Sequence, residues 1–171
     1  MGNHALSGIT SKTEKEIISD VKLILNSMSK SKFAYDEAMN TINFDLAVAG
    51  FSSEEKEKLS QTLISFSNSK DEKIDVLISD NLALFLDFFY RTIVDIKKVA
   101  KHGNVFHDII VRYYIEKEFA NIDDAVESID GVRSRATFIR RANEACYQLY
   151  IIWYCTSPKY ISCILSELMS L

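Results

Sequence analysis

Very few residues in this chain are of the kinds that interrupt a helix. Its 171 residues include five glycines and one proline, whereas hairpins, sandwiches and barrels need many short turns in which these residues recur. Leucine, isoleucine, alanine, lysine and glutamate are common instead, and the apolar residues recur at helical spacing. The sequence therefore predicts an all-α fold.

The length and hydrophobic content of the chain indicate one folded unit. With 171 residues, 47% of them hydrophobic, the chain can bury about two-thirds of its unfolded surface around one core, and it is too short for two full domains. Residues 1–12 carry no helical period, so we expect a flexible N-terminal arm there. Residues 13–171 should form a single α-helical domain, an irregular bundle of about seven to nine helices.

The overall charge argues against two classes of partner. The formal net charge is −4 at pH 7, so the chain lacks the broad positive field that non-specific nucleic-acid binding or adhesion to an anionic membrane would use. The first residues contain no apolar signal-peptide core, and no stretch of about eighteen apolar residues is present. We expect a soluble cytoplasmic protein that binds neither nucleic acid nor a membrane.

Two Ser/Thr-x-x-Glu motifs predict helix starts in the N-terminal third. Thr13 with Glu16, and Ser52 with Glu55, have the spacing of a capping box, in which each residue bonds a free backbone amide of the other. Apolar residues at steps of three and four follow each motif. Small or polar residues predict breaks at 29–31, at Gly50 and over 65–73.

The segment from residue 74 to 96 is apolar on most faces, which is typical of a helix in the middle of a bundle. Three lysines and a histidine follow before Gly103, where positive charge would meet the negative end of a helix dipole. We therefore expect one long, buried central helix. Further helices are expected over 104–119, from Asn121 or Asp123 to Gly131, over 134–156, and after Pro158.

The sequence contains few side chains in the patterns that bind a catalytic metal ion. A di-iron bundle needs Glu-x-x-His motifs, and none is present. His107 is followed by Asp108, a doublet with which some all-helical phosphohydrolases hold a metal, but the other two histidines are His102 and His4, the latter in the predicted arm. We expect no metal site. An all-α metal-dependent phosphohydrolase centred on His107 and Asp108 stays open as the alternative function.

The sequence also contains few residues that could act in nucleophilic catalysis. Cys146, Cys155 and Cys163 are odd in number, lack Cys-x-x-Cys spacing and lie in apolar segments. We expect reduced, buried thiols, whose pKa is raised by burial and which are therefore inert. No glycine-rich phosphate loop is present. The sequence thus predicts no catalytic residue, no cofactor and no enzymatic activity.

The stretch from residue 116 to 130 is strongly acidic. Its apolar residues at 119, 122, 126 and 129 should face inward, which leaves the carboxylates outside as an acidic ridge with Lys117 as the only cation. Asp123 and Asp124 would also favour a helix start. Like charges this close repel each other, so the ridge favours a basic partner. The carboxylates are Glu116, Glu118, Asp123, Asp124, Glu127 and Asp130.

Two other clusters bear on binding. Arg133, Arg135, Arg140 and Arg141 follow the acidic stretch, and the sequence leaves open whether they pair with it or bind an anion. Tyrosines lie at 147, 150 and 154, on a stripe beside the main apolar face of the last long helix. Exposed tyrosines often anchor protein interfaces. We therefore include Tyr147, Tyr150 and Tyr154 in the candidate partner-binding site.

These patterns favour a non-enzymatic, protein-binding helical domain. An inhibitor or immunity-type protein that neutralises a basic partner, such as a nuclease toxin, would use carboxylates in place of substrate phosphates. An adaptor or a secretion-chaperone-like helical protein would have a similar composition, and the sequence does not separate these uses. Neither the identity of the partner nor the oligomeric state follows from it.

Overall fold

The computed structural model describes residues 12–38, 51–67, 72–80, 82–99 and 101–169. All regular elements in these ranges are helical, and no strand occurs among them, which confirms the all-α fold. The predicted N-terminal arm lies outside the described residues except for Lys12. In chain order the helices are α1 (Glu14–Ala38), α2 (Ser53–Ser67), α3 (Glu72–Asp80), α4 (Leu82–Thr92), α5 (Ile96–Val99), α6 (Gly103–Asp108), α7 (Ile122–Ser128) and α8 (Arg135–Met169).

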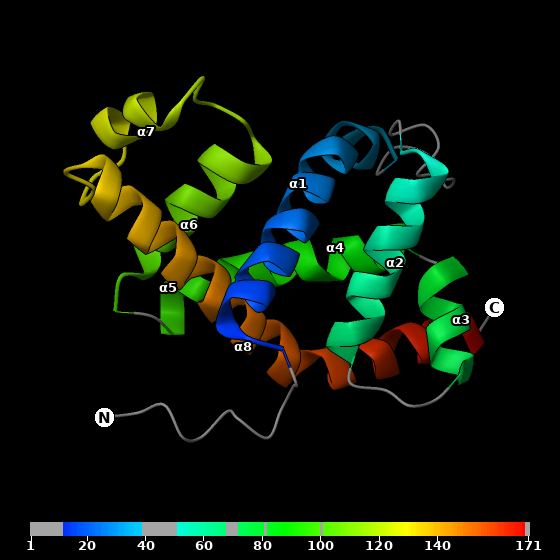
Figure 1. The fold of residues 1–171 in the computed structure, drawn as a ribbon. Helices are drawn as coiled ribbons and strands as arrows, with labels where there is room; N and C mark the ends of the chain where they lie inside the picture. The colour runs from blue at the N-terminus through cyan, green and yellow to red at the C-terminus, as the bar shows by residue number, and fades with distance from the viewer. Residues whose placement is uncertain (1–11, 39–50, 68–71, 81, 100, 170–171) are drawn as a thin grey trace.

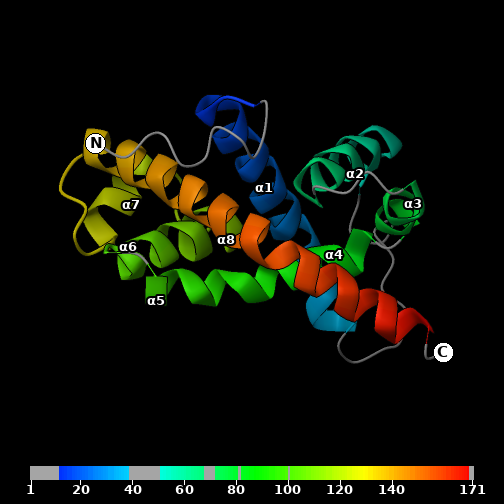
Figure 2. The same ribbon diagram turned by 90° about the horizontal axis from the view of Figure 1, so that it is seen from below.

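Helices α1 and α8 cross at the centre of the molecule and make the most extensive contact between any two elements (Figure 1). Helix α4 runs along α8, while α2 and α3 lie to one side of α1 (Figure 2). Helices α5, α6 and α7 lie on the other side, and α7 packs against the first part of α8. The fold therefore has α7 at one end, well separated from α2 and α3.

Both predicted capping boxes are confirmed. The backbone amide of Thr13 donates to Glu16 Oε2 (2.7 Å), and the Glu16 amide donates to Thr13 Oγ1 (3.3 Å). The amide of Ser52 donates to Glu55 Oε2 (2.9 Å), and the Glu55 amide donates to Ser52 Oγ (3.1 Å). These bonds satisfy amides that a helix start leaves free. The starts of α1 and α2 could thus be located from the sequence.

Two predicted breaks are wrong. Helix α1 continues through residues 29–31, and α8 continues through Ser157 and Pro158. In α1, Met28 is buried with Val21 and Ile24, and this tertiary packing outweighs the modest helix propensity of serine. In α8, the apolar positions of the sequence stay in phase on either side of Pro158, which favours one continuous helix. The segment between the predicted breaks at 29–31 and at Gly50 lies partly outside the described residues.

The expected single central helix over residues 74–96 is not found. This segment forms α3, α4, a 3₁₀ turn (Ile93–Asp95) and α5 in succession, and Val76 and Val94 are 59% and 55% exposed. At the end of α4 the Thr92 hydroxyl donates to the Phe89 carbonyl (2.6 Å), and the helix tightens immediately afterwards. The centre of the bundle is formed by α1 and α8 instead.

Trp153 of α8 is the largest of the fully buried side chains in the described part of the chain. Its indole Nε1 donates to Thr92 Oγ1 and to the Phe89 carbonyl (3.3 Å). The rings of Phe89 and Trp153 pack edge to face with centroids 4.9 Å apart. A buried indole thus finds polar partners where α4 ends, which joins α4 to α8.

Candidate protein-binding surface

Helix α7 is set in place at both ends by features that the sequence indicated. The Asn121 side-chain oxygen accepts hydrogen bonds from the amides of Asp123 (2.8 Å) and Asp124 (3.1 Å). Gly131 follows the helix with φ +85°, a left-handed conformation that favours glycine. The predicted cap at Asn121 and the predicted end at Gly131 are both confirmed.

The carboxylates of α7 and of the segments on either side of it are exposed. Ala125 and Ile129 are buried against the bundle, and Ile122 and Val126 pack partly against the core. The carboxylates alternate with them and are exposed. We refer to Glu116, Glu118, Asp123, Asp124, Glu127 and Asp130, all of which are exposed, as the acidic surface.

Arg112 holds the loop before α7, a role that sequence reasoning missed. Its Nε and Nη2 donate to the two carboxylate oxygens of Glu118 (2.6 and 2.8 Å), and its Nη1 donates to the Ser128 carbonyl (3.3 Å). The guanidinium also lies over the Phe119 ring, 4.9 Å from its centroid. One side chain therefore contacts the loop before α7 and the last residue of α7.

The Arg112–Glu118 pair changes the titration of both groups. Hydrogen bonding to Arg112 lowers the pKa of the Glu118 carboxyl, and the same contact raises the pKa of Arg112. A bidentate ion pair fixes the relative orientation of its two side chains in addition to bringing opposite charges together. Glu118 is therefore part of the framework of the acidic surface and is less available to a partner than the sequence suggested.

A π-helix places Arg112 where it can reach this loop. Residues Ile109–Ile115 form π-helical turns (η2), after which the Glu116 amide donates to the Val111 carbonyl (2.8 Å) and the Glu118 amide to the Arg112 carbonyl (2.9 Å). Lys117 then takes φ +52°, so the helix predicted to reach residue 119 ends at Ile115. Arg112 and Glu118 are six residues apart, a spacing that no helical pairing rule would have flagged.

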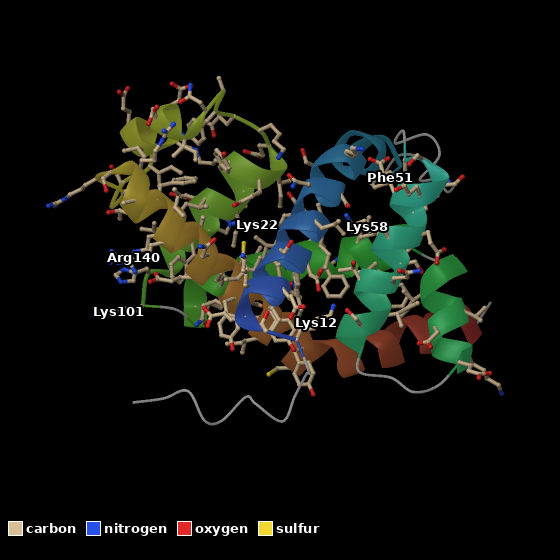
Figure 3. All side chains as sticks on the ribbon, viewed as in Figure 1. Lys12, Lys22, Phe51, Lys58, Lys101 and Arg140 are labelled. Atoms are coloured by element: carbon tan, nitrogen blue, oxygen red, sulfur yellow. The ribbon has the colours of Figure 1, made fainter. Side chains whose placement is uncertain are left out.

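The four arginines after α7 compensate the acidic surface only in part. Arg135 Nη2 lies 3.3 Å from Asp123 Oδ2, with both side chains more than 60% exposed, and such pairs contribute little. Arg141 pairs with Glu144 (2.6 Å) rather than with the acidic surface. Within the described ranges Arg133 and Arg140 form no ion pair, and Arg140 lies at the outside of α8 in Figure 3.

The tyrosines form a separate cluster on α8. Ring centroids of Tyr147 and Tyr150 are 6.2 Å apart, and those of Tyr150 and Tyr154 are 6.0 Å apart. Tyr150 is only 5% exposed, so its expected role as an exposed anchor is wrong; it packs between its two neighbours. Tyr147 lies twelve residues beyond Arg135, about 18 Å along the helix. The structure does not bring the tyrosines together with the acidic surface.

His107 and Asp108, the pair behind the alternative function, lie at the end of α6. His107 Nδ1 is 3.5 Å from Asp108 Oδ1, and burial, with nearby Lys97, lowers the pKa of the imidazole. The residues that the structure describes contain no group of three or more His, Cys, Asp or Glu side chains that could hold a metal ion.

Two of the cysteines differ in their surroundings. Cys146 is fully buried, and burial raises the pKa of its thiol to about 12. Cys155 is exposed, which contradicts the expectation that it is a core residue; it lies on the solvent side of α8 beside the buried Trp153 stripe. The side chain of Cys163 lies outside the described part of the chain.

Comparisons with known proteins give no relative: no family model, no curated protein and no solved structure matches the chain. None of the helices described here has the length and apolar character needed to cross a bilayer.

Proposed function

We propose that this domain binds a protein partner with a basic surface, and that the acidic surface around α7 makes the contact. An inhibitor or immunity-type protein fits this chemistry, because carboxylates on a rigid helix can occupy the site where a nuclease toxin would bind phosphates. The domain would neutralise its partner without chemistry of its own.

The position of Glu127 and Asp130 carries the proposal. Asp123 and Asp124 lie at the start of α7, where the helix dipole and the Asn121 cap favour negative charge. Glu127 lies in the last turn and Asp130 just beyond it, where negative charge is unfavourable. Both are exposed, and neither has an ion-pair partner among the described residues. Helix stability therefore explains the first two carboxylates and leaves the other two for a partner.

The framework supports this use of the surface. The Asn121 cap, the Gly131 turn and the Arg112 contacts hold α7 against the bundle, so the carboxylates are presented in one arrangement. Preorganised charge raises the rate of encounter with an oppositely charged partner and lowers the entropy lost on binding.

The test is the association rate with the product of the reading frame adjacent in the genome, because inhibitors are usually encoded beside their targets. Reversing Glu127 and Asp130 to Lys should slow association about tenfold at low salt and weaken its salt dependence. A matched variant reverses Glu57 and Glu72, which are exposed on α2 and α3 on the other side of α1. It changes net charge equally and should keep most of the wild-type rate. Equal rates for the two variants would contradict the proposed location.

A further inference from the structure

Helix α6 continues into η2 without a break, but the two differ in hydrogen-bond register. Asp108 and Ile109, where they meet, both have right-handed helical dihedrals, so residues 103–115 form one helix whose second half is π-helical. π-helical turns are rare and occur mostly as single turns, often at functional sites. The seven residues of η2 therefore need contacts that an α-helix at this place would not make.

The buried residues of η2 repeat at a spacing of five. Ile109 and Tyr114 form one pair. Ile110 and Ile115 form the other, and all four are buried. In an α-helix, residues five apart point about 140° away from each other, so Ile115 would leave the face of Ile110. Tyr113, which is partly buried in η2, would take its place, because it follows Ile109 by four residues and Ile110 by three. The π and α registers thus bury different residues.

Arg112 has an acidic neighbour in each register. In the π register it donates to both carboxylate oxygens of Glu118, six residues further on. In an α-helix the carboxylate beside it would be that of Glu116, since residues four apart share a face. The hydrogen bond to Glu118 raises the pKa of the Arg112 guanidinium, and the charges of Asp108 and Glu116 raise it further. The same arginine can therefore form an ion pair in either register.

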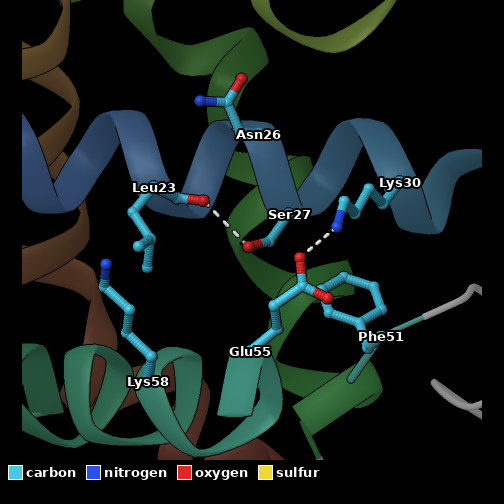
Figure 4. A pocket seen from close by; sticks show the side chains of 7 residues that line it. All are labelled: Leu23, Asn26, Ser27, Lys30, Phe51, Glu55 and Lys58. Carbon is cyan, nitrogen blue, oxygen red and sulfur yellow. Dashed lines mark hydrogen bonds and ion pairs between the residues drawn. The ribbon is translucent and has the colours of Figure 1, made fainter. Parts of the chain in front are cut away.

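Lys117 ends η2 in a conformation that a continuing α-helix does not allow. Its φ of +52° lies in the left-handed region, which is unfavourable for residues other than glycine. Its ammonium donates to Asn26 Oδ1 on α1 (2.6 Å) and lies 5.9 Å from the centroid of the Tyr114 ring. Figure 4 shows Asn26 on the face of α1 that is turned away from α2. Side-chain contacts of Arg112 and Lys117 thus offset an unfavourable backbone.

We propose that residues 109–118 are a two-state element that controls how α7 is held. In the first state the segment contains η2, and Arg112 donates to Glu118 and to the Ser128 carbonyl in α7. In the second state the segment is α-helical through residue 118, Arg112 pairs with Glu116, and its contact with α7 is lost.

A partner bound to the acidic surface favours the first state, because α7 is then held in one arrangement and the partner binds that state better. This step rests on the proposed function. The existence of two registers does not, since it depends on contacts within residues 109–118 and with α1 and α7.

The test identifies the carbonyl to which the Glu116 amide donates, in NMR spectra of the full chain. Scalar couplings across the hydrogen bond connect this amide to Val111 in the π register (2.8 Å) and to Arg112 in the α register. Relaxation dispersion at residues 109–118 measures the two populations. Glu118→Gln removes the charge that Arg112 binds in the π register, so the population of the α register should rise about fivefold. Glu116→Gln should lower it.

Glu127→Gln is the matched control, because it removes one charge from the acidic surface without touching Arg112. It should leave both populations unchanged. If the Glu116 amide of the Glu118→Gln protein still donates to Val111 alone, with no exchange at residues 109–118, the two-state element is overturned.

The coupling to a partner is tested with a hexa-arginine peptide, which stands in for a basic surface. Added to the Glu118→Gln protein, the peptide should lower the raised population of the α register. An unchanged population at the highest peptide concentration would overturn the coupling and leave the two registers standing. Conversely, association rates that do not respond to charge reversal at α7 would contradict the proposed function without affecting the register measurements.

Discussion

The region around Trp153 and the region around α7 are held together in opposite ways. Trp153 is fully buried, and its indole hydrogen bonds to Thr92 and Phe89 are buried as well. At α7 the fixing contacts are exposed: the Asn121 cap and the pair between Arg112 and Glu118. Buried apolar area stabilises far more than exposed ion pairs. The region around Trp153 therefore contributes most to the free energy of unfolding. The region around α7 can hold exposed carboxylates at little cost to that free energy.

This difference predicts how each region responds to substitution. Changes at the α4–α8 contact should lower the free energy of unfolding strongly, with no selective effect on binding. Changes at the acidic surface should leave the free energy of unfolding nearly unchanged and alter association.

Trp153→Ala should lower the free energy of unfolding by about 3 to 5 kcal/mol. The indole is fully buried and packs edge to face on Phe89, so its removal leaves a cavity and also leaves Thr92 without one partner. Urea unfolding followed by circular dichroism measures the change. A loss below about 1 kcal/mol would show that the core is not centred on this contact.

Thr92→Val should lower the free energy of unfolding by about 1 to 3 kcal/mol. Valine keeps the shape but removes the hydroxyl that accepts from Trp153 and donates to the Phe89 carbonyl. The matched variant Thr92→Ser keeps the hydroxyl and loses a methyl group, which costs about 1 kcal/mol. If valine were tolerated better than serine, the buried hydrogen bonds would contribute less than packing at this position.

Arg112→Met should lower the free energy of unfolding by about 1 kcal/mol and loosen the loop before α7. Methionine keeps an apolar stem against Phe119 but removes the bonds to Glu118 and Ser128. Hydrogen–deuterium exchange should speed up at residues 116–121 and remain unchanged around Trp153. A uniform increase across the whole chain would mean that Arg112 supports the core instead.

These contacts also show what the sequence could and could not supply. The capping boxes, the Asn121 cap and the Gly131 turn depend on neighbours within a few residues, so their spacing was visible and they are confirmed. The division of residues 74–96, the continuity of α8 past Pro158 and the Arg112 contacts depend on packing between distant segments. Periodicity carries no information on such contacts.

The burial of Tyr150 and the exposure of Cys155 follow the same rule. Both lie on α8 within five residues of each other, and which face of the helix is covered depends on where α1, α4 and η2 dock. Apolar residues at helical spacing predict that a helix has an apolar face. It does not fix the edges of that face, where both of these residues lie.

Acidic conditions should destabilise the protein through three carboxyls. The pKa values of Glu16, Glu55 and Glu118 are lowered by hydrogen bonds from Thr13, Lys30 and Arg112 respectively. Because each folded-state pKa lies below the ordinary value of 4.5, this stabilisation is complete above about pH 4.5 and is lost as the pH falls through the folded-state pKa.

Urea unfolding at pH 6 and at pH 3.5 measures this loss. Arg112→Met should show a smaller loss than wild type, because it has already lost the contribution of Glu118. Lys30→Met, which removes the main hydrogen bond to the Glu55 carboxyl, should behave in the same way for Glu55. An unchanged pH dependence in both variants would show that other groups govern acid unfolding.

The smallest expected effect is the most informative for function. Glu127 lies in the last turn of α7, four residues after Asp123, so it opposes the helix dipole and repels a like charge. Glu127→Lys should therefore raise the free energy of unfolding by about 0.2 to 0.5 kcal/mol, and Glu127→Gln by about half as much. Urea unfolding of both variants, with Glu57→Lys on α2 as the control, gives the comparison. A clear loss of stability would mean that Glu127 has a structural contact, and the proposed binding face would then be wrong. A gain would mean that the native carboxylate costs stability, so helix stability would not account for its presence, as the proposal for α7 assumes.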